Sequence, residues 1–131
     1  MAPGPDTPSE ICRAYLEAFA TGDADVVTAF VTEDFVNEHT AALGSGCEGR
    51  KEYARRVPGF LRSMPGLRYD VEDVIVDGDR VVATYTLRAH INNRDIAVRG
   101  AMRFVVRDGL IAKRTDYWDS LVFQRQAGMT D

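Results

Sequence analysis

Histidine 39 is the side chain of this sequence best suited to move a proton at neutral pH. An imidazole near its ordinary pKa of ~6.5 can give or take a proton there. His39 follows Asn37 and Glu38 and precedes the glycine-rich stretch Gly44-Ser45-Gly46. The pattern predicts an acid-base residue beside a loop, although a pocket-edge histidine that caps backbone groups fits the same pattern.

Asp116, in the last predicted strand, is the second candidate for acid-base work. An inward-facing Asp116 would lie among apolar and aromatic side chains: Tyr85, Met102, Phe104 and Trp118. A carboxyl group in such surroundings is a plausible general acid or base. Alternation does not decide whether Asp116 or Asp119 faces inward. An exposed Asp116 paired with Arg114 or Arg99 remains the alternative.

Tyr15 lies on the apolar face of the first predicted helix, where a buried hydroxyl needs a partner. It is able to donate to a developing oxyanion, or to bond a backbone carbonyl as an ordinary core tyrosine. We expect six further side chains to contact a ligand: Asn37, Tyr85, Trp118, Met102, Phe35 and Phe60. Asn37 is equally able to serve its own turn, and packing alone also explains Tyr85 and Trp118.

Several function classes are disfavoured by what the sequence lacks. The net charge of −4 argues against nucleic acid as the main partner. No apolar run approaches the ~18 residues of a membrane span, and residues 1–6 lack the features of a secretion signal. Cys12 and Cys47 have no metal-type spacing, and there is no glycine-rich phosphate loop. We therefore expect no metal, no cofactor, and reduced thiols in a cytoplasmic protein.

The first half of the chain predicts three helices that would position these groups. Thr7-Pro8-Ser9-Glu10 is a capping box, and the helix that it starts ends at Gly22. A second helix is expected over 24–32, followed by an extended segment over 35–40. A third is expected over 50–64, kinked or divided by Pro58.

The second half predicts four strands. The first covers 67–76, with a bulge near Asp73, and the second begins at 81. The third ends at 107, and the fourth covers 110–123. Alternation is clear from Val81 to Ala89, and short hairpin turns imply an antiparallel sheet. The 131 residues predict one α+β domain over 7–126, a loose segment over 1–6 and a tail over 127–131. Helices on the apolar face of a curved sheet would form a cone that encloses a pocket.

Element order and three sequence features together resemble the nuclear transport factor 2-like superfamily, above all its SnoaL-like branch. The features are Tyr15, the segment Glu33-Asp34-Phe35-Val36-Asn37-Glu38-His39, and the closing Arg114-Thr115-Asp116-Tyr117-Trp118-Asp119-Ser120. The resemblance covers about residues 9–126. It implies the cone fold, and it leaves the reaction open because the fold hosts many functions.

Compared with ketosteroid isomerase, Tyr15 falls where that enzyme has its oxyanion-binding tyrosine. His39 falls at its aspartate base and Gly100 at its second oxyanion donor, so half of the oxyanion hole is missing.

Compared with limonene epoxide hydrolase, Asp116 matches an aspartate of the last strand. Asn37 and His39 fall near the groups that hold water. Ala83 and Tyr85 stand where that enzyme has an arginine and a second aspartate.

The resemblance implies cofactor-free acid-base chemistry on a small, mostly apolar polyketide-, terpenoid- or steroid-like molecule. Isomerisation, cyclisation and water addition all remain open, with His39 moving the proton, Asp116 orienting it or acting as acid, and Tyr15 stabilising negative charge. The alternative is a noncatalytic module that binds apolar ligands or proteins. Because the family usually dimerises through the outer sheet face, Arg99, Arg103 and Arg107 there predict a homodimer.

Overall fold

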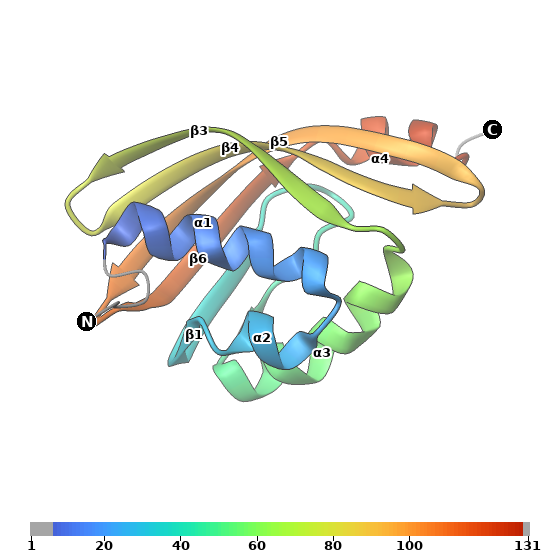
Figure 1. The fold of residues 1–131 in the computed structure, drawn as a ribbon. Helices are drawn as coiled ribbons and strands as arrows, with labels where there is room; N and C mark the ends of the chain where they lie inside the picture. The colour runs from blue at the N-terminus through green and yellow to red at the C-terminus, as the bar shows by residue number, and fades with distance from the viewer. Residues whose placement is uncertain (1–6, 130–131) are drawn as a thin grey trace.

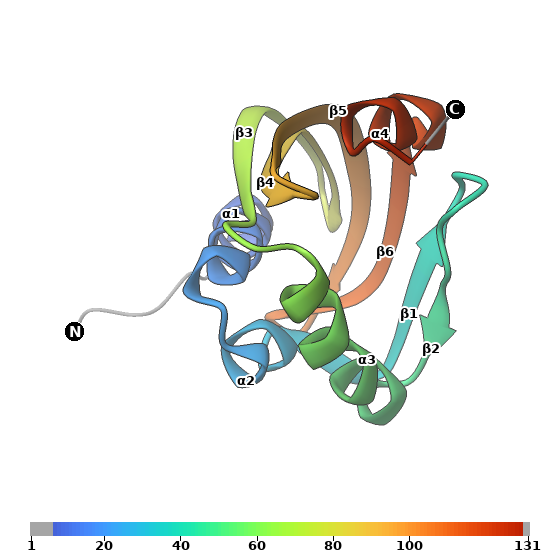
Figure 2. The same cartoon turned by 90° about the vertical axis from the view of Figure 1, so that its right-hand side faces the viewer.

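The computed structural model describes residues 7–129 and has the expected α+β architecture (Figure 1). The predicted loose segment 1–6 and residues 130–131 lie outside the described residues. Helices α1 (Pro8–Ala18), α2 (Ala24–Thr28) and α3 (Arg50–Ser63) precede a mostly β second half, and η1 (Phe19–Thr21) joins α1 to α2. In Figure 2 the sheet bends around one side of the molecule while these helices close the other. The cone-like fold predicted from the sequence is confirmed.

The sheet has six strands in the order β2-β1-β6-β5-β4-β3. Four of them form the antiparallel meander that the hairpin turns predicted: β3 (Arg68–Asp77), β4 (Arg80–Ile91), β5 (Arg94–Arg107) and β6 (Leu110–Trp118). The register of β3 against β4 shifts between Val71 and Asp73, where the bulge was expected. Alternate residues of β4 from Val81 to Ala89 face the core, with Leu87 only half-buried.

The prediction of a wholly antiparallel sheet is wrong at one edge, where β1 (Val31–His39) pairs in parallel with β6. β1 also pairs with the short β2 (Cys47–Glu48). The hairpin argument holds only for strands joined by a tight turn, and β1 is separated from β6 by α3 and four strands. The parallel pairing places His39 beside Asp116 in the register. The pairing that sequence reasoning missed therefore brings together two residues of the candidate site.

Three element boundaries differ from the sequence predictions. The second helix ends at Thr28 and a strand begins at Val31, inside the range given to that helix. Pro58 does not divide α3, which runs as one helix from Arg50 to Ser63. The last strand stops at Trp118, and α4 (Ser120–Gln126) follows because the Asp119 side chain caps its first turn.

The outer sheet face carries the arginines that predict a homodimer. Arg99 pairs with Glu72 at 2.9 Å and Arg107 with Asp34, whereas Arg103 has no acidic partner among the described residues. We expect sedimentation equilibrium to give twice the 14.5 kDa chain mass, and Arg103→Glu to weaken the association by charge repulsion. A single-chain mass at every concentration would contradict the prediction.

Candidate functional site

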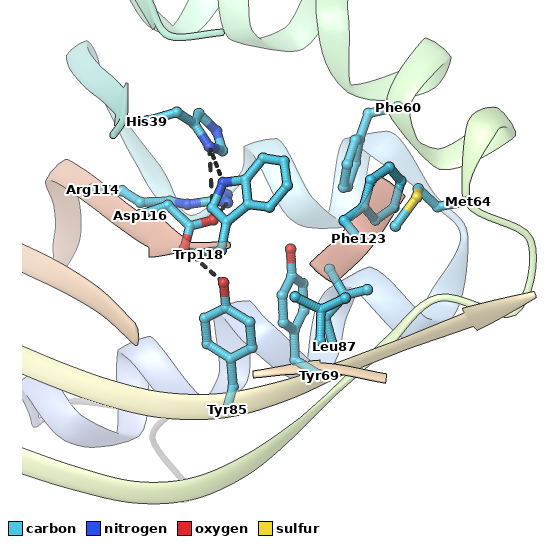
Figure 3. A pocket seen from close by; sticks show the side chains of 11 residues that line it. His39, Phe60, Met64, Tyr69, Tyr85, Leu87, Arg114, Asp116, Trp118 and Phe123 are labelled. Carbon is cyan, nitrogen blue, oxygen red and sulfur yellow. Dashed lines mark hydrogen bonds and ion pairs between the residues drawn. The ribbon is translucent and has the colours of Figure 1, made fainter. Parts of the chain in front are cut away.

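A cavity of about 100 Å³ opens between the sheet, the end of α3 and α4 (Figure 3). Its lining is mostly aromatic and aliphatic, with one polar cluster: His39, Phe60, Met64, Tyr69, Tyr85, Leu87, Val98, Arg114, Asp116, Trp118 and Phe123. Within residues 7–129, no group of three potential metal ligands occurs, and no helix is long and apolar enough to cross a membrane.

Asp116 is the centre of the polar cluster and is 3% exposed. Its Oδ1 accepts a hydrogen bond from the Tyr85 hydroxyl at 2.7 Å, and its Oδ2 accepts one from Arg114 Nη2 at 3.0 Å. Thr40 bonds the Asp116 carbonyl through both its N–H and its hydroxyl. Asp119 instead caps α4. The structure thus assigns Asp116, rather than Asp119, to the cavity.

Arg114 is the functional candidate that sequence reasoning missed. It is 4% exposed, and its Nη1 donates to the Tyr15 hydroxyl at 2.8 Å while Nη2 binds Asp116. Its Nε finds no partner among the described residues, and neither does Oδ1 of Asn37, its register neighbour on β1. The alternation of β6 places residue 114 on the same face as residue 116, which was the available signal.

Tyr15 lies behind Arg114 and does not line the cavity. It is fully buried, and its hydroxyl bonds the hydroxyl of Tyr53 as well as Arg114. The Tyr15 hydroxyl, which we expected to contact a substrate oxygen, therefore accepts a hydrogen bond from the Arg114 guanidinium instead. Of the six expected ligand contacts, three line the cavity and three do not. The three that line the cavity are Tyr85, Trp118 and Phe60. The other three, Asn37, Met102 and Phe35, are buried outside the cavity lining.

Tyr69 is the tyrosine that does present its hydroxyl to the cavity. Its side chain is largely buried on β3, and its ring packs edge-on against Tyr85 at 5.0 Å. In Figure 3 the hydroxyl points into the cavity. Burial raises the pKa of Tyr69 well above its ordinary value, so the group stays protonated as a donor.

His39 lies at the end of β1 with Nδ1 3.8 Å from Asp116 Oδ2. The same nitrogen accepts a hydrogen bond from Trp118 Nε1 at 3.2 Å. Burial, and then the charge of Arg114, lower the pKa of His39 to about 4, against the opposing effect of Asp116. The imidazole is therefore neutral at pH 7. Its expected titration near ~6.5 is not what these surroundings support.

We expect the NMR shifts of His39 to titrate with a midpoint at about pH 4. Because its folded pKa lies below the unfolded value of ~6.5, the unfolded chain binds more protons between these two values. Stability should thus fall as pH drops through that window. Urea unfolding at pH 7 and pH 5 should show a smaller loss in His39→Asn than in the native chain. An equal loss, or titration of His39 near pH 6.5, would contradict the assignment.

Gly100 explains how Tyr85 reaches Asp116. The two residues are register partners on β5 and β4. A Cβ at position 100 would lie 2.5 Å from the Tyr85 hydroxyl oxygen and 2.7 Å from the Tyr117 carbonyl oxygen. The phenol thus occupies the space that a side chain at position 100 would fill. The Tyr85 phenol thus fills the place where the family resemblance puts a second oxyanion donor, and its hydroxyl donates to Asp116 instead.

Gly100→Ala should therefore push Tyr85 off Asp116. Overpacking of this kind costs about 1–3 kcal/mol, and a lost hydrogen bond to the carboxylate adds to it. Thermal unfolding should show the loss. Gly59→Ala is the comparison for glycine replacement as such, because the backbone at Gly59 is not left-handed and a Cβ there would meet nothing closer than 3.7 Å. An unchanged melting temperature for Gly100→Ala would contradict the close approach.

Comparison with known proteins gives the same fold for nearly the whole chain. A protein with a ketosteroid isomerase-like fold from Catenulispora acidiphila, solved in complex with trimethylamine, superposes with a TM-score of 0.84 at 19% identity, covering 93% of this chain and 95% of that one. An epoxide hydrolase of M. tuberculosis that resembles limonene epoxide hydrolase gives 0.79 at 22% identity, covering 93% and 90%.

A candidate polyketide cyclase from Xanthomonas campestris has 28% identity and a TM-score of 0.74, covering 92% of this chain and 96% of that one. Comparison with curated proteins finds no match. The family model described as the SnoaL-like domain matches residues 12–114. On that match, together with the cone fold, this chain belongs to the SnoaL-like domain family.

Proposed function

We propose that this protein is a cofactor-free enzyme that transfers a proton at the carbon next to a carbonyl group of a small, mostly apolar substrate. The observation that carries the proposal is Asp116, a carboxylate that is 3% exposed, borders an apolar cavity and is held from two sides. A fixed carboxylate in a water-poor site is a competent base for carbon acids. A structural neighbour described as a candidate polyketide cyclase is compatible with the proposal.

Four polar side chains then have a defined task. Asp116 takes the proton from carbon, the C–H electron pair forms the new C=C bond, and the carbonyl π pair moves onto the oxygen. Tyr69 donates a hydrogen bond to that enolate oxygen. Arg114 and Tyr85 hold the carboxylate in place. In an isomerisation, Asp116 returns the proton to another carbon. In a cyclisation, the enolate carbon attacks a second carbonyl carbon, the π pair of that carbonyl moves onto its oxygen, and the resulting alkoxide takes the proton from Asp116.

The size of the cavity narrows the substrate class. An engineered cavity of ~150 Å³ holds one benzene molecule, so about 100 Å³ admits an acyclic ketone or a small single ring. A polycyclic steroid-like molecule does not fit unless the aromatic side chains that line the cavity move apart. Two of these side chains are Phe60, which is 38% exposed, and Phe123. We therefore favour small ketones over the larger molecules that the family resemblance allows.

Deuterium exchange tests the proposal without knowledge of the natural substrate. Butanone, cyclopentanone and 2-cyclopentenone are incubated with the protein in D₂O, and loss of their α-proton signals is followed by NMR. We expect the protein to accelerate exchange above the buffer rate for at least one of them. If compounds bind in the cavity and none exchanges faster than in buffer, the enzyme proposal fails.

A noncatalytic binding module is the second candidate, and a specific observation favours it. Both oxygens of Asp116 already accept a hydrogen bond, so the carboxylate is satisfied without a ligand. Trimethylamine, the ligand of one structural neighbour, is a useful probe together with the neutral ketones. Because Arg114 neutralises Asp116, we expect neutral ligands to bind more tightly than the ammonium. Binding that survives His39→Ala and Asp116→Ala, without any exchange, would favour this candidate.

A further inference from the structure

His39 Nδ1 has two polar neighbours that make opposite demands on it. The indole N–H of Trp118 donates to it at 3.2 Å, and the carboxylate of Asp116 lies at 3.8 Å. Both neighbours lie on β6, two residues apart, and both line the cavity (Figure 3). An indole nitrogen only donates, whereas an ionised carboxylate only accepts. Nδ1 of a neutral imidazole can satisfy one of them at a time.

The two distances from His39 Nδ1 show which of the two hydrogen bonds is formed. A separation of 3.2 Å is a hydrogen bond, whereas 3.8 Å is beyond that range. Nδ1 therefore carries the lone pair, and the single proton of the neutral ring lies on Nε2. Arg114 remains the only described donor to Asp116 Oδ2.

The indole and the imidazole are both fixed by their surroundings. Trp118 packs edge-on against Phe123 of α4 with ring centroids 5.9 Å apart, and Asp119 caps that helix directly after it. His39 is held by the loop that contains Gly44. A Cβ at Gly44 would collide with Cβ of His39, so this loop packs directly against the His39 side chain. Neither ring needs to move for the bond to persist.

We propose that Trp118 is a positioning residue that fixes His39 as the Nε2–H tautomer and thereby keeps His39 out of a hydrogen bond with Asp116. Without the indole N–H, His39 would be free to place a proton on Nδ1, move closer across the 3.8 Å separation and donate that proton to Asp116 Oδ2. That third donor would occupy a carboxylate lone pair and make Asp116 a weaker base. This consequence rests on the proposed function, whereas the tautomer assignment does not.

The native chain allows a direct test because it contains one tryptophan and two histidines. In ¹⁵N-labelled protein with His90→Asn, all imidazole signals come from His39. We expect Nδ1 to resonate as an unprotonated nitrogen, Nε2 as a protonated one, and a scalar coupling to join Trp118 Nε1 to His39 Nδ1 across the hydrogen bond. A protonated Nδ1 would overturn the proposal.

Trp118→Phe tests the causal step, since it keeps an aromatic ring and removes only the N–H and part of the ring system. We expect the proton of His39 to move from Nε2 to Nδ1. Phe123→Leu is the matched control: it loosens the packing of Trp118 but keeps the donor, and the tautomer should not change. If Trp118→Phe leaves the proton on Nε2, Trp118 does not set the tautomer. These measurements need no substrate, so a failed exchange assay and a failed tautomer assignment remain distinguishable.

Discussion

Replacing Asp116 with asparagine should slow ketone deuterium exchange by about 10²–10⁴-fold, the usual contribution of a positioned general base. Asparagine keeps the size of the side chain and an oxygen that can accept from Tyr85, but it does not take up a proton at neutral pH. Ligand affinity should change little, because the apolar lining supplies most of the contact.

The matched control is Asp119→Ser. It removes a carboxylate three residues along the chain and keeps a side chain that caps α4. Its exchange rate should stay within about threefold of the native rate, well inside one ~1.4 kcal/mol step. Equal rate losses in the two variants would mean that general damage to the end of β6, rather than loss of a base, explains the effect.

Replacing Arg114 with methionine should destabilise the protein by about 3–5 kcal/mol, because a buried carboxylate loses its counter-charge. Arg114 and Asp116 are 4% and 3% exposed, so water does not replace the lost partner. The Tyr15 hydroxyl also loses the Nη1 donor. Urea unfolding curves, with the slope checked for constancy, measure the loss.

The double variant Arg114→Met/Asp116→Leu separates charge from packing. Removing both charges should recover a large part of the loss, since well-packed apolar residues replace buried ion pairs at little cost. If the single variant loses less than about 1 kcal/mol of unfolding free energy, the Arg114–Asp116 pair is effectively solvated, as a surface pair would be. The pair would then not be shielded from water as its burial indicates. If the double variant is no more stable than the single one, packing rather than charge explains the loss.

The parts of the fold that could be predicted are those governed by local rules. The capping box at Thr7 and the alternation from Val81 to Ala89 each act within a few residues, and the structure places a helix start and a half-buried strand there. Tight turns fix the direction of the strands that they join. The direction of β1 depends on a pairing with β6 more than 70 residues away, which no local pattern contains.

The candidate site was predictable only in part, for a physical reason. Asp116 and His39 were identified by chemical type, and the structure brings them within 3.8 Å of each other. Arg114 was missed as a site residue because arginine is almost always exposed unless it is paired, and its partners come from α1 and β6. The same burial withdraws Tyr15 from the cavity and lowers the pKa of His39. Such effects follow from assembled surroundings rather than from residue type.

A crystal structure of the Asp116→Asn variant with the ketone that the native protein exchanges fastest tests most directly whether Asp116 is the base. We expect the ketone inside the cavity, with its α-carbon against residue 116 and its oxygen within hydrogen-bonding distance of the Tyr69 hydroxyl. A ketone bound elsewhere, or bound with its oxygen turned toward the apolar wall and its α-carbon away from residue 116, would contradict the claim that Asp116 is the base of this site.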